Sequence, residues 1–234
     1  MNMKKNNLNQ KSKNFKDFFY KNKFNFSSYP INRLKKISIV NDKTKLLENL
    51  KLKILKINNC ELKKISKNIV FGDGDINSPL MLIGEAPGQT EDEKGKPFVG
   101  EAGLLLNNML KAININRNDV YVTNVVNYRP PLNRKPEISE INKYSIYLRE
   151  HISIIDPKIL IFLGSTAMNS MFGINNKISE VRGTWKELII KNKTFLSMIS
   201  FHPAYLLRKT DQKKFSWQDL KEVRRKIDEL KINI

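Results

Sequence analysis

The stretch LMLIGEAPGQTEDEKGKPFVGEAG, residues 80–103, decides the fold of this 234-residue chain. Its first residues, Leu80–Ile83, form a short apolar run of the kind that builds a buried strand. The run passes directly into GEAPG, residues 84–88, whose glycines and proline indicate a loop. An amphipathic helix is expected behind it, over residues 101–113. A buried strand, a glycine-rich loop and a helix in this order are typical of an α/β protein.

Similar apolar runs alternate with helical patterns along the rest of the chain. The runs lie at 120–126, 159–163 and 195–200. The helical patterns lie at 44–56, 138–155, 164–171 and 215–230, and a hairpin-like excursion is expected over 181–188. This alternation predicts a three-layer α/β/α fold with a central four-stranded, mostly parallel sheet.

Composition restricts the classes of protein to which the chain can belong. Hydrophobic residues make up 40% of it, which is enough for one sizeable core and excludes a chain that is disordered over most of its length. There is no run of about 18 apolar residues and no signal-peptide pattern, so we expect no membrane contact and a cytoplasmic location. The net charge of +19 favours an anionic partner.

The charge is concentrated near the N-terminus. Residues 1–45 hold 12 basic and 2 acidic residues, and seven aromatic residues fall between Phe15 and Tyr29. We therefore divide the chain into a basic, aromatic-containing, partly disordered extension over 1–43 and one domain over 44–234. The extension is either an arm that follows a nucleic-acid backbone or a poorly ordered tail with a compositional bias.

Three loops follow predicted strands and carry most of the chemistry. In parallel sheets, ligands bind outside the carboxyl ends of the strands, so the loops at 84–98, 124–134 and 201–208 are expected to form one site. The first loop holds Glu85 and an acidic group at 91–93, which is unusual in so basic a protein. Carboxylates there would hold a water or stabilise a developing cation, unless the loop is merely a solvated acidic surface.

The other two loops present an amide and an imidazole. Asn124 ends a predicted strand, and its side chain offers both a donor and an acceptor, as the edge of a base requires. His202 follows a buried strand and precedes a proline, which would hold its ring at the mouth of the sheet. Leu206 and Leu207 beside Arg208 are similar to an apolar wedge next to a phosphate ligand.

Three long motifs, in order, carry a family resemblance. They are GEAPG-x-x-ED-x-x-G-x-PFVG-x-AG-x-LL, TNVV-x-x-RPP-x-NR-x-P and HPAYLLR. From about Cys60 to Leu230 the chain resembles the uracil-DNA glycosylase superfamily, and specifically its family-4 type. The resemblance implies a monofunctional DNA repair glycosylase that flips uracil out of DNA, hydrolyses its N-glycosidic bond and leaves an abasic site. The alternative is a nucleic-acid-binding protein of the same fold with weak or no catalysis.

The motifs also imply roles for individual residues. Glu85, Glu91 and His202 match the catalytic positions. Glu85 lies in the loop that orients the attacking water, Glu91 polarises that water or balances the sugar cation, and His202 supports charge on the departing base. The expected uracil-binding residues are Gly84, Phe98, Asn124 and His202. The expected DNA contacts are Arg129, Arg134, Leu206, Leu207 and Arg208.

The chain departs from the family at its cysteines. Family-4 enzymes hold a [4Fe–4S] cluster with four cysteines, but only Cys60 matches one of them, and the other three positions fall on Ile57, Tyr128 and Tyr144. We therefore expect no cluster and no other cofactor, with Cys60 as a lone remnant and the tyrosines filling the space. Residues 132–139 contain no histidine, so covalent trapping of DNA is not expected. The expected partner is uracil-containing DNA, bound by a monomer.

Overall fold

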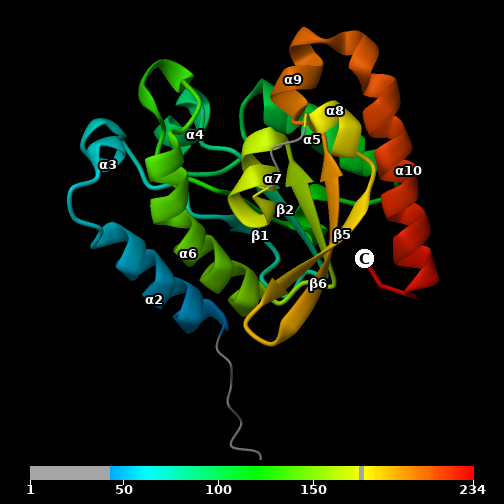
Figure 1. Cartoon of the computed structure of the whole chain (residues 1–234), viewed down its shortest axis with the longest axis horizontal. Helices are drawn as coiled ribbons and strands as arrows, with labels where there is room; N and C mark the ends of the chain where they lie inside the picture. The colour runs from blue at the N-terminus through cyan, green and yellow to red at the C-terminus, as the bar shows by residue number, and fades with distance from the viewer. Residues whose placement is uncertain (1–42, 174–176) are drawn as a thin grey trace, which may run out of the picture. The chain divides into compact units, whose positions relative to one another are not determined.

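One mixed sheet forms the centre of the structure, a computed structural model that describes residues 43–173 and 177–234. The spatial order of the strands is β1-β3-β2-β4-β6-β5 (Figure 1). Their bounds are Asp73–Gly74 for β1, Leu80–Gly84 for β2, Tyr121–Asn124 for β3, Ile159–Leu163 for β4, Trp185–Ile190 for β5 and Lys193–Ser200 for β6.

The four predicted strands are the four inner strands, and they are parallel. β2 lies between β3 and β4, with Leu82 opposite both Val122 and Ile161, and β4 also pairs with β6. The predicted α/β fold is confirmed, but the sheet has six strands rather than four. The additional strands lie at the edges and run antiparallel: β1 pairs with β3, and β5 forms a hairpin with β6.

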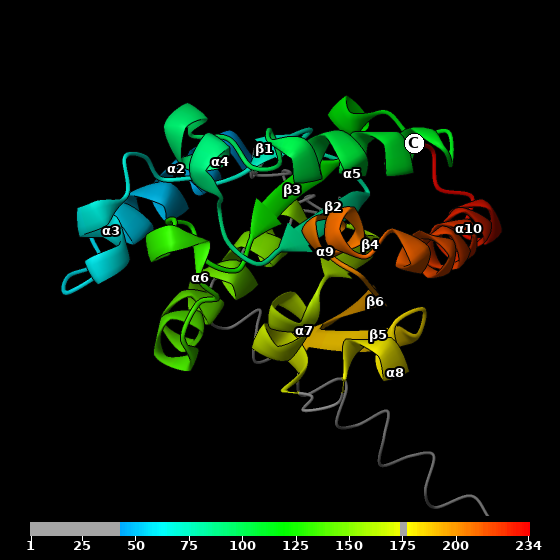
Figure 2. The same ribbon diagram turned by 90° about the horizontal axis from the view of Figure 1, so that it is seen from above.

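Helices cover both faces of the sheet (Figure 2), as the continuous apolar strands require. The α-helices are α2 (Lys43–Leu55), α3 (Glu61–Ile65), α4 (Gln89–Lys94), α5 (Glu101–Lys111), α6 (Ile138–Ile155), α7 (Ser165–Phe172), α8 (Ile178–Val181), α9 (Pro203–Arg208) and α10 (Lys213–Glu229). Short 3₁₀ turns lie at Arg117–Asp119, Pro131–Asn133 and Thr210–Gln212.

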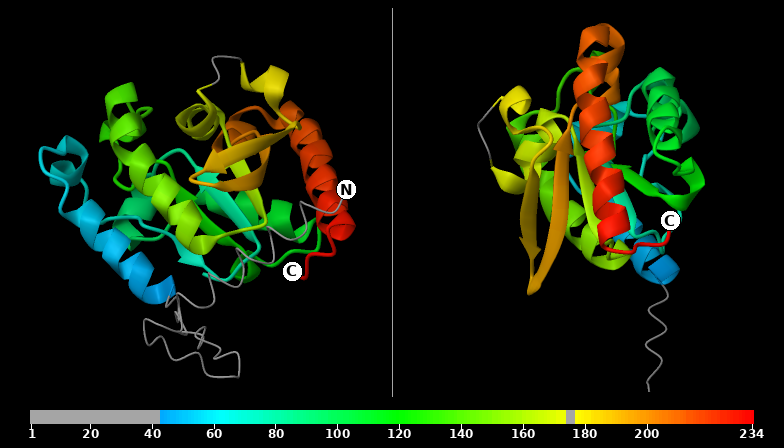
Figure 3. Two further views of the ribbon diagram at one scale, coloured as in Figure 1. Left: turned by 60° about the horizontal axis from the view of Figure 1, so that its bottom comes forward. Right: turned by 90° about the vertical axis from the view of Figure 1, so that its right-hand side faces the viewer.

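The core is divided between the two faces of the sheet because successive strand residues point in opposite directions. Met81 and Ile83 of β2 pack into the cluster that contains buried residues of α2, α6 and α7. Leu80 and Leu82 pack into the second cluster, with buried residues of α5 and α10. Figure 3 shows α10 lying along the sheet, with the β5–β6 hairpin at the edge.

The strand ends determine where a site can form. Because β2, β3, β4 and β6 are parallel, the loops that follow them meet at one edge of the sheet. No helix in the described ranges is long and apolar enough to cross a membrane. The predicted extension over 1–43 lies outside the described residues except for Lys43, so the division of the chain at 43/44 stays a prediction.

Candidate active site

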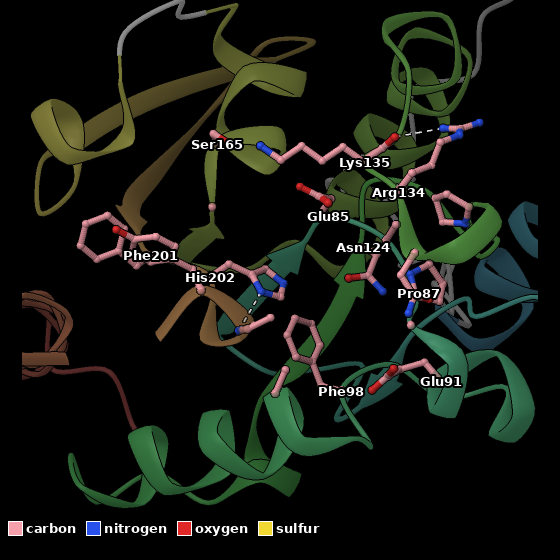
Figure 4. A pocket seen from close by; sticks show the side chains of 18 of the residues that line it. Glu85, Pro87, Glu91, Phe98, Asn124, Arg134, Lys135, Ser165, Phe201 and His202 are labelled. Atoms are coloured by element: carbon pink, nitrogen blue, oxygen red, sulfur yellow. Dashed lines mark hydrogen bonds between the residues drawn. The ribbon is translucent and has the colours of Figure 1, made fainter. Parts of the chain in front are cut away.

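A pocket of about 550 Å³ opens at the carboxyl ends of the parallel strands. Residues from all three predicted loops line it: Glu85, Glu91 and Phe98 from the first, Asn124 from the second and His202 from the third. In Figure 4 the side chains of Phe98, Asn124 and His202 surround a common space, with Glu85 above it. The expected convergence of the loops is therefore observed.

Gly84 allows the side chains of Asn124 and Phe98 to approach each other at the base of the pocket. It is the last residue of β2 and lies opposite Asn124, the last residue of β3. A Cβ atom at Gly84 would lie 2.4 Å from Oδ1 of Asn124 and 2.6 Å from Cζ of Phe98. Only glycine therefore lets the Asn124 amide and the Phe98 ring come together over the end of this strand.

Phe98 presents a ring beside the imidazole of His202. The two ring centroids lie 5.7 Å apart with an interplanar angle of 27°, and Phe98 is only 7% exposed. Its backbone has a φ of 55°, an uncommon conformation for a bulky residue, which the surrounding contacts must hold in place.

Glu91 provides such a contact. Its Oε1 atom accepts hydrogen bonds from the backbone amides of Val99, at 3.0 Å, and Gly100, at 2.8 Å. Gly100 is the N-cap of α5, so the carboxylate also lies at the positive end of that helix. One oxygen of Glu91 thus anchors the backbone immediately after Phe98, which the sequence analysis did not predict.

Glu85 is held by a residue that the sequence analysis missed. The hydroxyl of Thr166, in the first turn of α7, donates a short hydrogen bond to Oε2 of Glu85. Thr166 is buried, and it lies 81 positions from its partner along the chain. No local pattern reveals a contact across that separation, although the position of Thr166 just after a parallel strand was available from the sequence.

His202 is fixed in one tautomer at the start of α9. Its Nδ1 atom accepts a hydrogen bond from the backbone amide of Ala204 at 3.1 Å. Burial, and to a lesser extent the positive charge of Arg208, lower the pKa of His202 to about 4. The ring is therefore neutral near pH 7 with its proton on Nε2, and so acts as a hydrogen-bond donor from that atom.

Comparison with known proteins agrees with this geometry. The family model of the uracil-DNA glycosylase superfamily matches residues 71–221. The chain belongs to this superfamily. A type-4 uracil-DNA glycosylase of Sulfurisphaera tokodaii is 40% identical over 186 residues, which cover 76% of this chain and 83% of the relative. The type-4 enzyme of Thermotoga maritima is 39% identical over 165 residues, 70% of this chain and 84% of the relative.

The expected DNA contacts of this glycosylase-family chain fall into two groups. Arg134 and Arg208 line the pocket, although Arg134 also forms an ion pair with Glu140 at 2.7 Å. Arg129 is not among the lining residues, and its Nε atom donates to Asn133 at 2.7 Å.

The prediction that Leu206 and Leu207 together form an exposed wedge is wrong for Leu206. Leu206 is 1% exposed and packs in the core cluster that includes buried residues of α5, whereas Leu207 is 38% exposed. A rim residue that the sequence analysis did not name is Lys135, whose side chain extends across the pocket toward Ser165 (Figure 4).

The prediction that the protein has no iron–sulfur cluster is contradicted by the comparisons. The relatives are type-4 uracil-DNA glycosylases, which are iron–sulfur enzymes, so membership of this group points to a [4Fe–4S] cluster. We withdraw the prediction of an absent cofactor.

The residues around Cys60 do not match the ligand set that such a cluster uses. The Cys60 thiol is buried 3.2 Å from the Tyr144 hydroxyl, and the Tyr128 ring packs edge-on against Tyr144 with centroids 6.4 Å apart. Within residues 43–173 and 177–234, no group of three or more His, Cys, Asp and Glu side chains is placed to hold a metal ion. One thiol and two phenols do not supply the four thiolates that hold such a cluster, so these side chains do not fit it.

Proposed function

We propose that this protein removes uracil from DNA: it flips the nucleotide out, hydrolyses the N-glycosidic bond and leaves an abasic site. One observation carries the proposal. Phe98, Asn124 and His202 come from three loops and face a single pocket of about 550 Å³. The three side chains offer a stacking surface, a paired donor and acceptor, and a neutral donor, which are the groups that bind and release a uracil ring.

Recognition of the base is assigned to Phe98 and Asn124. Uracil presents an N3–H donor beside the O4 acceptor, and the Asn124 amide has the complementary acceptor and donor. Cytosine reverses this pattern and would leave buried polar groups unpaired. Stacking on Phe98 contributes about 1–3 kcal/mol, which offsets part of the cost of flipping the nucleotide.

Departure of the base is assigned to His202. When the bond between C1′ and N1 breaks, its electron pair moves onto uracil and spreads to O2. Because Nδ1 of His202 accepts from Ala204, the Nε2–H group is the donor available to that oxygen. A fixed neutral donor placed where negative charge develops lowers the barrier without a proton transfer.

Attack by water is assigned to the acidic loop. Glu85, held by Thr166, orients the water and takes its proton as the oxygen bonds to C1′. Glu91 also lines the pocket, and its carboxylate is assigned to balance positive charge on the sugar. The hydroxyl group ends on C1′, and the uracil anion is released and takes up a proton from solvent.

The partner and setting follow from the same proposal. The substrate is uracil-containing DNA, whose phosphates face the basic rim formed by Arg134, Lys135 and Arg208. We propose that the domain over 44–234 acts as a monomer in the cytoplasm.

An alkali-cleavage assay tests the proposal. Wild-type protein incubated with a uracil-containing oligonucleotide should give strand breaks at the uracil after alkali. The Asn124→Ala variant should lose most of this activity and still bind DNA with the same salt dependence. Protein that binds the oligonucleotide but gives no alkali-labile site would contradict the proposal and favour a binding protein without catalysis.

A further inference from the structure

The two halves of α10 differ in how their positive charges are compensated. In the second half every cation has an acidic partner on the same helix. Arg224 pairs with Asp228 at 2.5 Å, Arg225 with Glu222 at 2.6 Å, and Lys226 with Glu229 at 2.9 Å. This half therefore presents a nearly neutral surface.

The first half carries uncompensated lysines. Lys213, Lys214 and Lys221 are exposed, and among the described residues none of them forms an ion pair. Trp217 lies between them, is 43% exposed, and has the Lys221 ammonium 5.9 Å from the centroid of its ring. Lys209, just before the helix, is likewise exposed and unpaired within these residues. We call Lys209, Lys213, Lys214, Trp217 and Lys221 the α10 stripe.

Apart from Lys209, which precedes the helix, the residues of the α10 stripe lie on one side of α10. Residues 213, 217 and 221 are four apart, so they lie above one another on the surface. A different face packs into the core through Leu220, Val223 and Ile227. Packing of α10 therefore does not require the stripe, and concentrating like charges on one face is electrostatically unfavourable without an anionic partner.

The α10 stripe continues the rim of the pocket. Arg208 lines the pocket at the end of α9, and the stripe begins at the next residue. Figure 1 shows α10 starting beside α9 at the end of the molecule where β6 ends, then running back along the sheet. From Lys213 to Lys221 the helix advances roughly 12 Å, along which one DNA strand presents about three phosphates.

We propose that the α10 stripe binds the phosphate backbone of the duplex beside the flipped nucleotide. This inference rests on the proposed DNA substrate and adds a contact outside the pocket. With this contact, the surface of the protein that covers DNA extends from the pocket toward α10. The lysines neutralise phosphates, and the exposed indole of Trp217 lies against the sugar–phosphate backbone between them.

The paired half of α10 supplies a matched control. The triple variant Lys213→Gln, Lys214→Gln, Lys221→Gln and the control Arg224→Gln, Arg225→Gln, Lys226→Gln each lose three positive charges from the same helix. Binding of each full-length protein to a uracil-free duplex is measured by fluorescence anisotropy at several salt concentrations. The stripe variant should reduce the slope of log K against log salt by about 2–3, because each lost phosphate contact removes about 0.9. The control should keep the wild-type slope.

A fluorescence titration tests the same surface without removing charge. Trp185 and Trp217 are the two tryptophans, and Trp185 is bonded to Glu222 in the paired half of α10. Adding duplex should quench the emission of the Trp185→Phe variant, in which Trp217 remains, and leave that of Trp217→Phe nearly unchanged. Quenching of the opposite variant would overturn the proposal.

The outcomes separate this inference from the proposed function. The duplex contains no uracil, so the salt slopes are measured whether or not the protein excises uracil. Equal slopes for the stripe variant and the control would overturn the α10 stripe and leave the glycosylase proposal intact. Unequal slopes with no uracil excision would support a DNA contact and contradict the glycosylase. At saturating protein, the stripe variant should excise uracil at the wild-type rate.

Discussion

Two phenylalanine–histidine pairs lie on opposite faces of the sheet and differ in what they face. Phe98 and His202 stack at 5.7 Å on the side of the pocket, and Phe71 and His151 stack at 4.4 Å on the other side. Burial lowers the pKa of both histidines, to about 4 for His202 and about 3 for His151. Nε2 of His151 is bonded to the Tyr121 hydroxyl at 2.9 Å, whereas His202 lines the pocket.

The comparison teaches that a neutral histidine beside a phenylalanine is not in itself a mark of function. Both rings are held by hydrogen bonds, and both are neutral near pH 7. What distinguishes His202 is that its bonded nitrogen is Nδ1, leaving Nε2 on the side of a cavity.

Exchanging each histidine for glutamine should give the largest difference in the rate of uracil excision between two variants. His202→Gln should lower single-turnover uracil excision by about 10²–10³, the usual effect of losing one donor to developing negative charge. His151→Gln should excise uracil at close to the wild-type rate but unfold at a lower temperature. Equal losses of excision in the two variants would contradict the assignment of the leaving-group role to His202.

Thr166 tests whether the pocket also depends on the hydrogen bond to Glu85. Thr166→Val removes the hydroxyl at nearly constant volume and should lower the excision rate about 10- to 100-fold, the value of one hydrogen bond to a charged group. KM should change little, because Glu85 acts on water rather than on DNA. Thr166→Ser keeps the hydroxyl and should restore most of the rate, whereas a merely structural role would not be rescued in this way.

Glu91 separates positioning of Phe98 from electrostatic stabilisation. Glu91→Ala removes the acceptor for the amides of Val99 and Gly100, so Phe98 should lose its position and both kcat and KM should worsen, by roughly tenfold or more in kcat. Glu91→Gln keeps an oxygen acceptor and loses only the charge, so kcat should fall and KM should stay near wild type. A Glu91→Gln variant with full kcat would exclude charge stabilisation by this side chain.

The smallest effect concerns acid stability. Both histidines have folded-state pKa values below that of an unfolded chain, about 6.5. Between about pH 3 and 6.5 the unfolded chain binds more protons, so the free energy of unfolding decreases as the pH falls. Each histidine contributes up to about 1.4 kcal/mol per pH unit. Urea unfolding of His151→Gln should show a shallower pH dependence in this range, and an unchanged dependence would contradict the burial of a neutral His151.

The sequence predicted the inner sheet well because its strands are unusual. Leu80–Ile83 and Ile159–Leu163 are buried on both faces and read as continuous apolar runs. The edge strands were not predicted, because β1 has only two residues and the exposed residues of β5 interrupt its run of apolar side chains. A hairpin is present, as expected, but its turn lies between β5 and β6, after Ile190, rather than at Gly183.

The sequence predicted the site residues that lie in local motifs, and it missed the hydrogen bonds that depend on contacts between distant segments. Asn124 and His202 stand at strand ends, so their convergence follows from topology. The bonds from Thr166 to Glu85 and from the 99–100 backbone to Glu91 depend on how loops fold back, which no periodicity encodes. Burial of Leu206 follows from the exact rotation of α9, a helix of six residues.

Release of free uracil tests the central claim most directly. Wild-type protein is incubated at pH 7 with a duplex containing one uracil, and free base and alkali-labile sites are counted in the same sample. The account predicts one free uracil for each alkali-labile site and an unbroken strand before alkali, as hydrolysis without a lyase step requires. DNA that is bound but releases no uracil, or strands that break without alkali, would contradict it.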